Sequence, residues 1–304
     1  MSAFVIEQLL NSLQLGLMLF LLASGLTLIF GIMDLINLAH GSLYMIGGFL
    51  TVALVKLTGS FLLALPLAVL GTALVALCVE TTLLRRFYGR DHLSQVLATF
   101  ALILISNDTI RFFFGANAVM LDIPKGLAEP VELFAGFSYS SYRILVIVVG
   151  LATALFLGAL ITRTRLGMWI RAGASDREMA RAMGVNIKLV FSLVFALGAA
   201  LCGLAGGLLG PLLSVQVGMG ESIIILAFVV VVIGGTGSVK GAFIGALAIG
   251  LLDTFGRSYL PLWMRANMPN LSPDTMAPAL AAILTYVLMV LVLFWRPQGL
   301  FKTT

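Results

Sequence analysis

Charge is scarce in this chain. Only 10% of its 304 residues are Asp, Glu, Lys or Arg, whereas a soluble domain would be about a quarter charged. The composition therefore excludes an ordinary soluble protein. The two histidines, His40 and His92, are far apart and give no metal-ligand spacing. The two cysteines, Cys78 and Cys202, lie in apolar runs, which is typical of small packing residues, so we expect neither a disulfide nor a bound metal.

Motifs for nucleotide binding and for catalysis are also missing. The segment GGTGSVKG at 234–241 resembles a phosphate-binding loop, but Lys240 is followed by Gly241, so the Gly-Lys-Ser/Thr ending is absent. Neither His-Glu-x-x-His nor Gly-x-Ser-x-Gly occurs. We therefore expect no catalytic residue and no cofactor in this chain, and any ATP-driven activity needs an ATPase on another polypeptide.

Long apolar runs are abundant instead. The chain is 61% hydrophobic with a mean hydropathy of +1.12. Runs of about 20 apolar residues are long enough to cross a hydrocarbon core of about 30 Å, and inside lipid such runs must be helical. The sequence predicts an all-α polytopic transmembrane bundle of about 8–10 helices in a single domain, 1–304, with the first helix retained. The predicted spans are 8–30, 41–56, 61–84, 94–114, 142–162, 188–210, 222–234, 241–260 and 277–295.

The basic residues predict the orientation of this bundle. Placing a polar insert at about 163–187 in the cytoplasm puts 12 of the 18 Lys and Arg residues inside and 6 outside, in agreement with the positive-inside rule. The net charge of +5 thus requires no nucleic acid. The C-terminal RPQGLFKTT, including Lys302, is then cytoplasmic. The external connection at about 115–141 has turn and strand signals that predict a folded loop. Either a docking role or a plain connection fits it.

The polar insert contains the sequence SDREMARAMGVN at 175–186. It predicts one short helix of about ten residues, with Ser175 and Glu178 forming a capping box and Gly184 in the left-handed position past its end. So short a helix is marginal alone in water, so either its own bundle or a partner's groove must hold it. Its small Ala/Met face, without bulky anchors, favours a protein groove over the alternative of an amphipathic helix on lipid headgroups. The candidate contact residues are Ser175, Asp176, Glu178, Ala180, Arg181, Met183 and Gly184.

Two glycine-rich segments interrupt the apolar runs. In residues 31–48, Asp34, Asn37 and His40 recur at i, i+3 and i+6, which predicts one helical face. This face is either a gate or a polar cluster at the cytoplasmic membrane surface. In residues 234–250 the glycines are four apart, a spacing that favours either close helix packing or a translocation path. These glycines are Gly237, Gly241 and Gly245.

Three acidic residues fall in or near the predicted spans. Asp108 has Arg111 three residues later, which predicts an intrahelical pair. Glu80 and Asp253 lie where a span end is also compatible. A proton-coupled carrier needs one such residue as its relay, and no single candidate stands out.

Four segments together resemble one known family, the permease subunits of bacterial branched-chain amino acid ABC importers of the LivH type. The similarity extends over nearly the full length. The segments are LTLIFGIMDLINLAHGSLYMIGG at 26–48, RAGASDREMARAMGVN at 171–186, GGTGSVKGAFIGA at 234–246 and FWRPQGLF at 294–301.

The resemblance implies a bundle of the LivH and ribose-permease type in the bacterial inner membrane. It implies a second, LivM-like permease chain, two cytoplasmic ATPases that use ATP and Mg, and a periplasmic solute-binding protein. The helix at 175–185 would be the coupling element seated on an ATPase. The family also includes permeases for urea, short amides and aromatic acids. A channel, a proton-coupled carrier and a membrane-embedded enzyme are the competing classes.

Overall fold

The computed structural model of the protein describes residues 2–134, 136–267 and 272–301. Eight of its helices are long and apolar enough to cross a membrane, and α9 is a shorter apolar helix. The predicted all-α bundle is confirmed, and every predicted span overlaps one helix. The α-helices are α1 (Ser2–Met33), α2 (His40–Thr58), α3 (Phe61–Thr82), α4 (His92–Phe114), α5 (Ser141–Arg163), α6 (Arg165–Ser175), α7 (Arg177–Ala182), α8 (Ile187–Leu209), α9 (Met219–Gly234), α10 (Val239–Asn267) and α11 (Pro273–Trp295).

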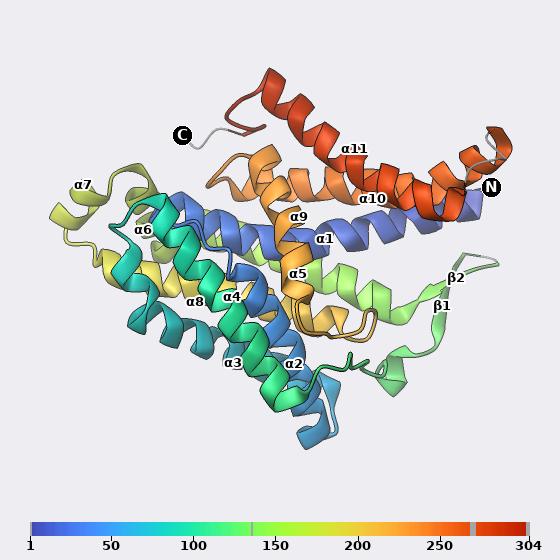
Figure 1. The fold of residues 1–304 in the computed structure, drawn as a ribbon, viewed down its shortest axis with the longest axis horizontal. Coiled ribbons are helices and arrows are strands. Elements are labelled where there is room, and N and C mark those ends of the chain that lie inside the picture. The colour runs from blue at the N-terminus through green and yellow to red at the C-terminus, as the bar shows by residue number, and fades with distance from the viewer. Residues whose placement is uncertain (1, 135, 268–271, 302–304) are drawn as a thin grey trace.

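Helix α1 is the centre of the bundle. Residues 16–29 of α1 are buried, and the helix packs against α5, α8, α9 and α10. In Figure 1, α2, α3 and α4 lie on one side of α1, and α10 and α11 lie on the other. Helix α7 is at one end of the molecule and a β-hairpin, residues 130–140, is at the other. We call these the α7 end and the hairpin end.

The hairpin belongs to the predicted external loop. A 3-10 turn, η2 (Lys125–Leu127), precedes strands β1 (Pro130–Phe134) and β2 (Phe137–Ser140), which pair antiparallel with Pro130 opposite Ser140. Val119 and Val215 form a second backbone bridge, with N–H to O distances of 2.9 and 2.8 Å. The expectation of a folded loop at 115–141 is therefore confirmed for the described residues.

Helices α2 and α8 approach until their backbones touch. Gly47 of α2 lies against Gly203 of α8, and Gly206 of α8 lies against the carbonyl oxygen of Tyr44. In lipid the helices gain little from burying apolar side chains against one another, so small residues that allow close backbone contact hold them together.

The predicted helical face at 34–40 is wrong. Helix α1 ends at Met33, and Asp34 has a left-handed backbone with φ of 51°. A short polar side chain tolerates this conformation better than most, and the helix cannot continue through it. Residues 34–37 are irregular and α2 begins at His40, so Asp34 is exposed while Asn37 and His40 are buried.

A short segment after α11, residues 296–301, lies across the end of α9; we call it the strap. The N–H groups of Leu300 and Phe301 donate to the carbonyls of Ile233 and Gly234 at 2.8 and 3.1 Å. The last carbonyls of a helix have no partner within it, so the strap completes the end of α9. Lys302, counted in the predicted orientation, lies outside the described residues.

Candidate functional site

The predicted polar insert forms two short helices, α6 and α7. Asp176 lies between them with an extended backbone, and its Oδ1 accepts hydrogen bonds from the N–H groups of Glu178 and Met179, both at 2.9 Å. The predicted capping box from Ser175 is therefore wrong, because Ser175 is the last residue of α6 and Asp176 is the N-cap. The helix is also shorter than predicted, with six residues.

The end of α7 agrees with the sequence. Gly184 has φ of 87°, and its N–H donates to the carbonyl of Arg181 at 3.0 Å. The N–H of Val185 donates to the carbonyl of Ala180 at 3.0 Å. These two bonds define a Schellman motif, which favours glycine at its left-handed position. The predicted left-handed role of Gly184 is confirmed.

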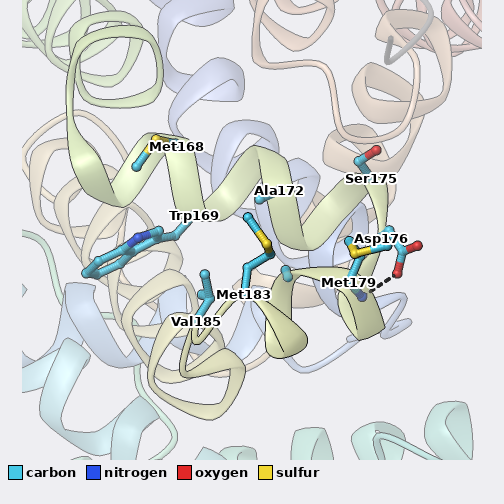
Figure 2. Close-up of a pocket in the computed structure, with 9 residues that line it drawn as sticks. Met168, Trp169, Ala172, Ser175, Asp176, Met179, Met183 and Val185 are labelled. Carbon is cyan, nitrogen blue, oxygen red and sulfur yellow. Dashed lines mark hydrogen bonds between the residues drawn. The ribbon is translucent and has the colours of Figure 1, made fainter.

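An apolar hollow of about 450 Å³ lies between α6 and α7 (Figure 2). Three methionine side chains at it are strongly exposed: Met168 at 52%, Met179 at 61% and Met183 at 79%. Methionine is flexible and polarisable, so such a surface suits apolar side chains of a partner. Its lining residues are Met168, Trp169, Ala172, Ser175, Asp176, Met179, Ala180, Met183 and Val185.

On the α6 side of this hollow, sequence reasoning identified Ser175 and missed three other lining residues. Met168, Trp169 and Ala172 recur at i, i+1 and i+4, a spacing that places them on one side of a helix. That spacing was the available signal. In contrast, Ala180 was identified from the sequence, and it is 96% buried against the rest of the chain. Glu178 and Arg181 are exposed on α7 and are not among the residues that line the hollow.

Helix α7 is connected to the bundle through aromatic contacts. The guanidinium of Arg177 lies over the ring of Phe191 on α8, 5.7 Å from its centroid. Phe191 in turn meets the ring of Tyr88 edge to face, with centroids 5.4 Å apart. Cation–π and edge-to-face contacts of this kind each stabilise by about 0.5–1.5 kcal/mol.

Tyr88 leads to a fully buried carboxylate, Glu80, near the end of α3. The Tyr88 hydroxyl donates to Glu80 at 2.6 Å, and the Ser192 hydroxyl of α8 donates to it at 2.8 Å. Arg85, in the 3-10 turn η1 (Leu84–Phe87), donates to both carboxylate oxygens at 3.2 and 3.1 Å. Burial and the Glu80 bond raise the pKa of Tyr88, and the Glu80 bond raises the pKa of Arg85. Glu80 thus ties α3, η1 and α8 together.

The predicted gate residues of 31–48 lie partly inside the bundle. His40 is fully buried, with Nε2 at 3.3 Å from the carbonyl oxygen of Leu22 and 3.0 Å from Sγ of Cys202. Asn37 is 1% exposed. This burial is unlike a cluster at the membrane surface, and a gate role for Asp34, Asn37 and His40 stays a prediction.

The predicted glycine stripe is only partly helical: Gly241 and Gly245 lie on α10, whereas Gly237 lies in the turn between α9 and α10. Gly237, with φ of 81°, meets the backbone of Gly31 at the end of α1. Gly241 touches the backbone of Gly234, and Gly245 lies against the carbonyl oxygen of Val230, so both serve the packing of α10 on α9. This geometry favours close packing; a place on a translocation path stays a prediction.

The other two acids that the sequence placed in or near the spans, Asp108 and Asp253, are paired on their own helices. Asp108 and Arg111 are 3.4 Å apart, which confirms the predicted pair. Asp253 forms an ion pair with Arg257, four residues later, with Nε of Arg257 at 2.8 Å from Oδ2 of Asp253. Within residues 2–134, 136–267 and 272–301, no three His, Cys, Asp or Glu side chains gather as metal ligands would.

These features define a class of protein. It is a multi-pass bundle of apolar helices that carries an exposed two-helix unit, α6 and α7, at one end. Comparison with known families agrees. The family described as "Branched-chain amino acid transport system / permease component" matches residues 8–293. The chain belongs to this permease family.

Relatives of known name cover almost the whole chain. A "High-affinity branched-chain amino acid transport system permease protein BraD" from Pseudomonas aeruginosa is 28% identical over 97% of this chain and 95% of its own. The Escherichia coli protein LivH, of the same description, is 26% identical over 98% and 95%. A probable LivH from Methanocaldococcus jannaschii is 30% identical over 80% and 78%. No solved structure matches the chain.

Proposed function

We propose that this permease carries branched-chain amino acids across the bacterial inner membrane, driven by ATPases on separate chains. The observation that carries the proposal is the methionine-lined hollow between α6 and α7, which is apolar and exposed. Helix α7, on one side of the hollow, is fixed at its start by the Asp176 cap and at its end by the Gly184 motif. An exposed apolar surface rimmed by charge marks a protein interaction site.

The proposed assembly contains this chain, a LivM-like second permease chain, two cytoplasmic ATPases and a periplasmic solute-binding protein. ATP and Mg are bound by the ATPases. The hollow receives a surface of one ATPase, and the exposed Glu178 and Arg181 of α7 contact the same ATPase. The α7 end and the strap therefore face the cytoplasm. The excess of basic residues on these segments supports this orientation. The hairpin end then faces the binding protein.

When ATP binding closes the two ATPases, their movement shifts α7, and α7 passes this movement to the bundle. The contact from Arg177 to Phe191 and the bonds from Ser192 and Tyr88 to Glu80 give the movement a rigid route into α8 and α3. A switch between outward and inward access needs only a few kcal/mol of difference in partner affinity between the two states. Gate roles for Asp34, Asn37, His40 and Gly237 belong to this proposal.

The experiment is ATP-dependent uptake of labelled leucine into proteoliposomes that hold the complete transporter. Met179→Asp with Met183→Asp places charge in the hollow, so the ATPases should no longer co-purify and uptake should fall to background. Met120→Asp is the matched control, because Met120 is also a strongly exposed methionine (67%) but lies in the external loop. It should leave co-purification of the ATPases unchanged.

Three results would contradict the proposal. Full ATPase binding in the double variant would show that the hollow is not the contact surface. Uptake without ATPase subunits would favour a channel, and uptake that follows an imposed proton gradient would favour a carrier. Urea or an aromatic acid transported in place of leucine would keep the mechanism and change the solute.

A further inference from the structure

Helix α9 begins inside the bundle, at a distance from its hairpin end. Val215, which precedes it, is bridged to Val119 in the external loop, and a Cβ on Gly48 of α2 would lie 3.1 Å from Val215. Gly220, in the first turn of α9, lies against the backbone of Gly41. Gly41 and Gly48 are seven residues apart on α2, a rise of about 10 Å. The chain therefore moves about 10 Å along the axis of α2, away from the hairpin end, between Val215 and Gly220.

Helix α4 gives the same depth for the next residue, Glu221. The Oε1 atom of Glu221 accepts a hydrogen bond from Nδ2 of Asn107 at 2.7 Å. Asn107 is seven residues before Phe114, where α4 ends, which again corresponds to about 10 Å of helix. Glu221 thus lies within the length of a membrane-crossing helix.

Glu221 is nevertheless exposed on the single chain, as is its neighbour Ser222. Among the described residues no Lys, Arg or His lies within 4.0 Å of its carboxylate. A carboxylate facing lipid at this depth is unfavourable, and ionisable residues inside membranes face a bundle interior or a water-filled path. The exposed start of α9 therefore faces such a path.

The geometry points to Glu221 as the residue that contacts the ammonium group of the transported amino acid. Asn107 occupies only Oε1 and fixes the carboxylate, so Oε2 is left to accept from a cationic donor. Ile225, one turn further along α9 and 51% exposed, offers an apolar surface to an aliphatic side chain. A carboxylate selects for a zwitterion with an ammonium group, because it repels an aromatic acid anion and forms no ion pair with neutral urea.

This inference rests on the proposed function, and its test uses the complete transporter in proteoliposomes. We expect Glu221→Gln to lower leucine uptake roughly tenfold or more, as loss of a charge-assisted hydrogen bond would. Co-purification of the permease chains and stimulation of ATP hydrolysis by the loaded binding protein should be unchanged. Asp108→Asn is the matched control, because Asp108 is an exposed carboxylate directly after Asn107 on α4 and is paired with Arg111. It should keep normal uptake.

A second arm restores the charge. In a Cys78→Ala background, Glu221→Cys should be inactive and should react with a membrane-impermeant methanethiosulfonate that carries a sulfonate. The added negative charge should recover part of the uptake, whereas the trimethylammonium analogue of this reagent should not.

Several results would overturn the inference. They are normal uptake by Glu221→Gln, no reaction of the introduced cysteine, and equal recovery with either reagent. Loss of the second permease chain from the Glu221→Gln complex would instead make Glu221 an interface residue. Absence of leucine uptake in the unmodified transporter would refute the proposed function, which keeps the two failures distinguishable.

Discussion

Replacing Arg85 by alanine removes one side of a buried ion pair. Glu80 is fully buried, whereas 36% of the Arg85 side chain is exposed. Breaking a buried pair from one side costs about 3–5 kcal/mol because a buried charge is left uncompensated. Solvent screens part of this interaction at Arg85, and the hydroxyls of Tyr88 and Ser192 continue to donate to the carboxylate. We therefore expect a loss of about 2 kcal/mol in the free energy of unfolding.

The double variant Glu80→Gln with Arg85→Ala separates charge from packing. Glutamine carries no charge; its amide oxygen can accept from one hydroxyl and its amide nitrogen can donate to the other. The double variant should therefore be more stable than Arg85→Ala alone by about 1 kcal/mol. Unfolding by SDS titration in mixed micelles measures these differences. Arg86→Ala is the control, because Arg86 is exposed and forms no ion pair among the described residues. It should stay within about 0.5 kcal/mol of the unmodified chain.

Two results would refute this reasoning. If Arg85→Ala were no less stable than Arg86→Ala, the ion pair would contribute nothing to the fold. If the double variant were less stable than Arg85→Ala alone, an unpaired charge at Glu80 would not be the cause of the loss.

Two further substitutions test the backbone geometry. Gly184→Val places a β-branched residue at φ of 87°, which costs at least about 1–2 kcal/mol, so α7 should loosen and the ATP hydrolysed per leucine transported should rise. Gly184→Asn should keep a normal ratio because asparagine tolerates this conformation, and equal ratios for both would argue against the motif. Gly206→Val would drive its side chain into the Tyr44 carbonyl and lower the yield of monodisperse protein in fluorescence-detected size exclusion. Gly158→Val, where no atom lies within 4 Å, should leave that yield unchanged, and equal yields would contradict tight α2–α8 packing.

The membrane helices could be predicted because length and apolar content alone decide which segments can cross lipid. The break at residues 34–39 could not, since Asp34 ends α1 through a left-handed backbone, and nothing in the apolar pattern marks that turn. Close packing of the glycines at 241 and 245 followed from their spacing, but the partners of these glycines did not.

The two short helices α6 and α7 were predicted only in part, for a similar reason. Ser175 and Asp176 are equally good N-cap residues, and only the end of α6 decides between them. Glu221 escaped notice because the predicted span began one residue later, so the side chain counted as part of a loop. Its depth depends on the contact between Gly41 and Gly220, which pairs residues far apart in the chain.

The strap has a consequence for biogenesis. The carbonyls of Ile233 and Gly234 acquire their donors from the strap only after α10 and α11 have been synthesised. A nascent chain can therefore have every membrane segment inserted while one surface of the protein is still incomplete. A frameshift just after Trp295 would leave the hydrophobic segments intact yet produce a protein that membrane quality control can recognise as unfinished.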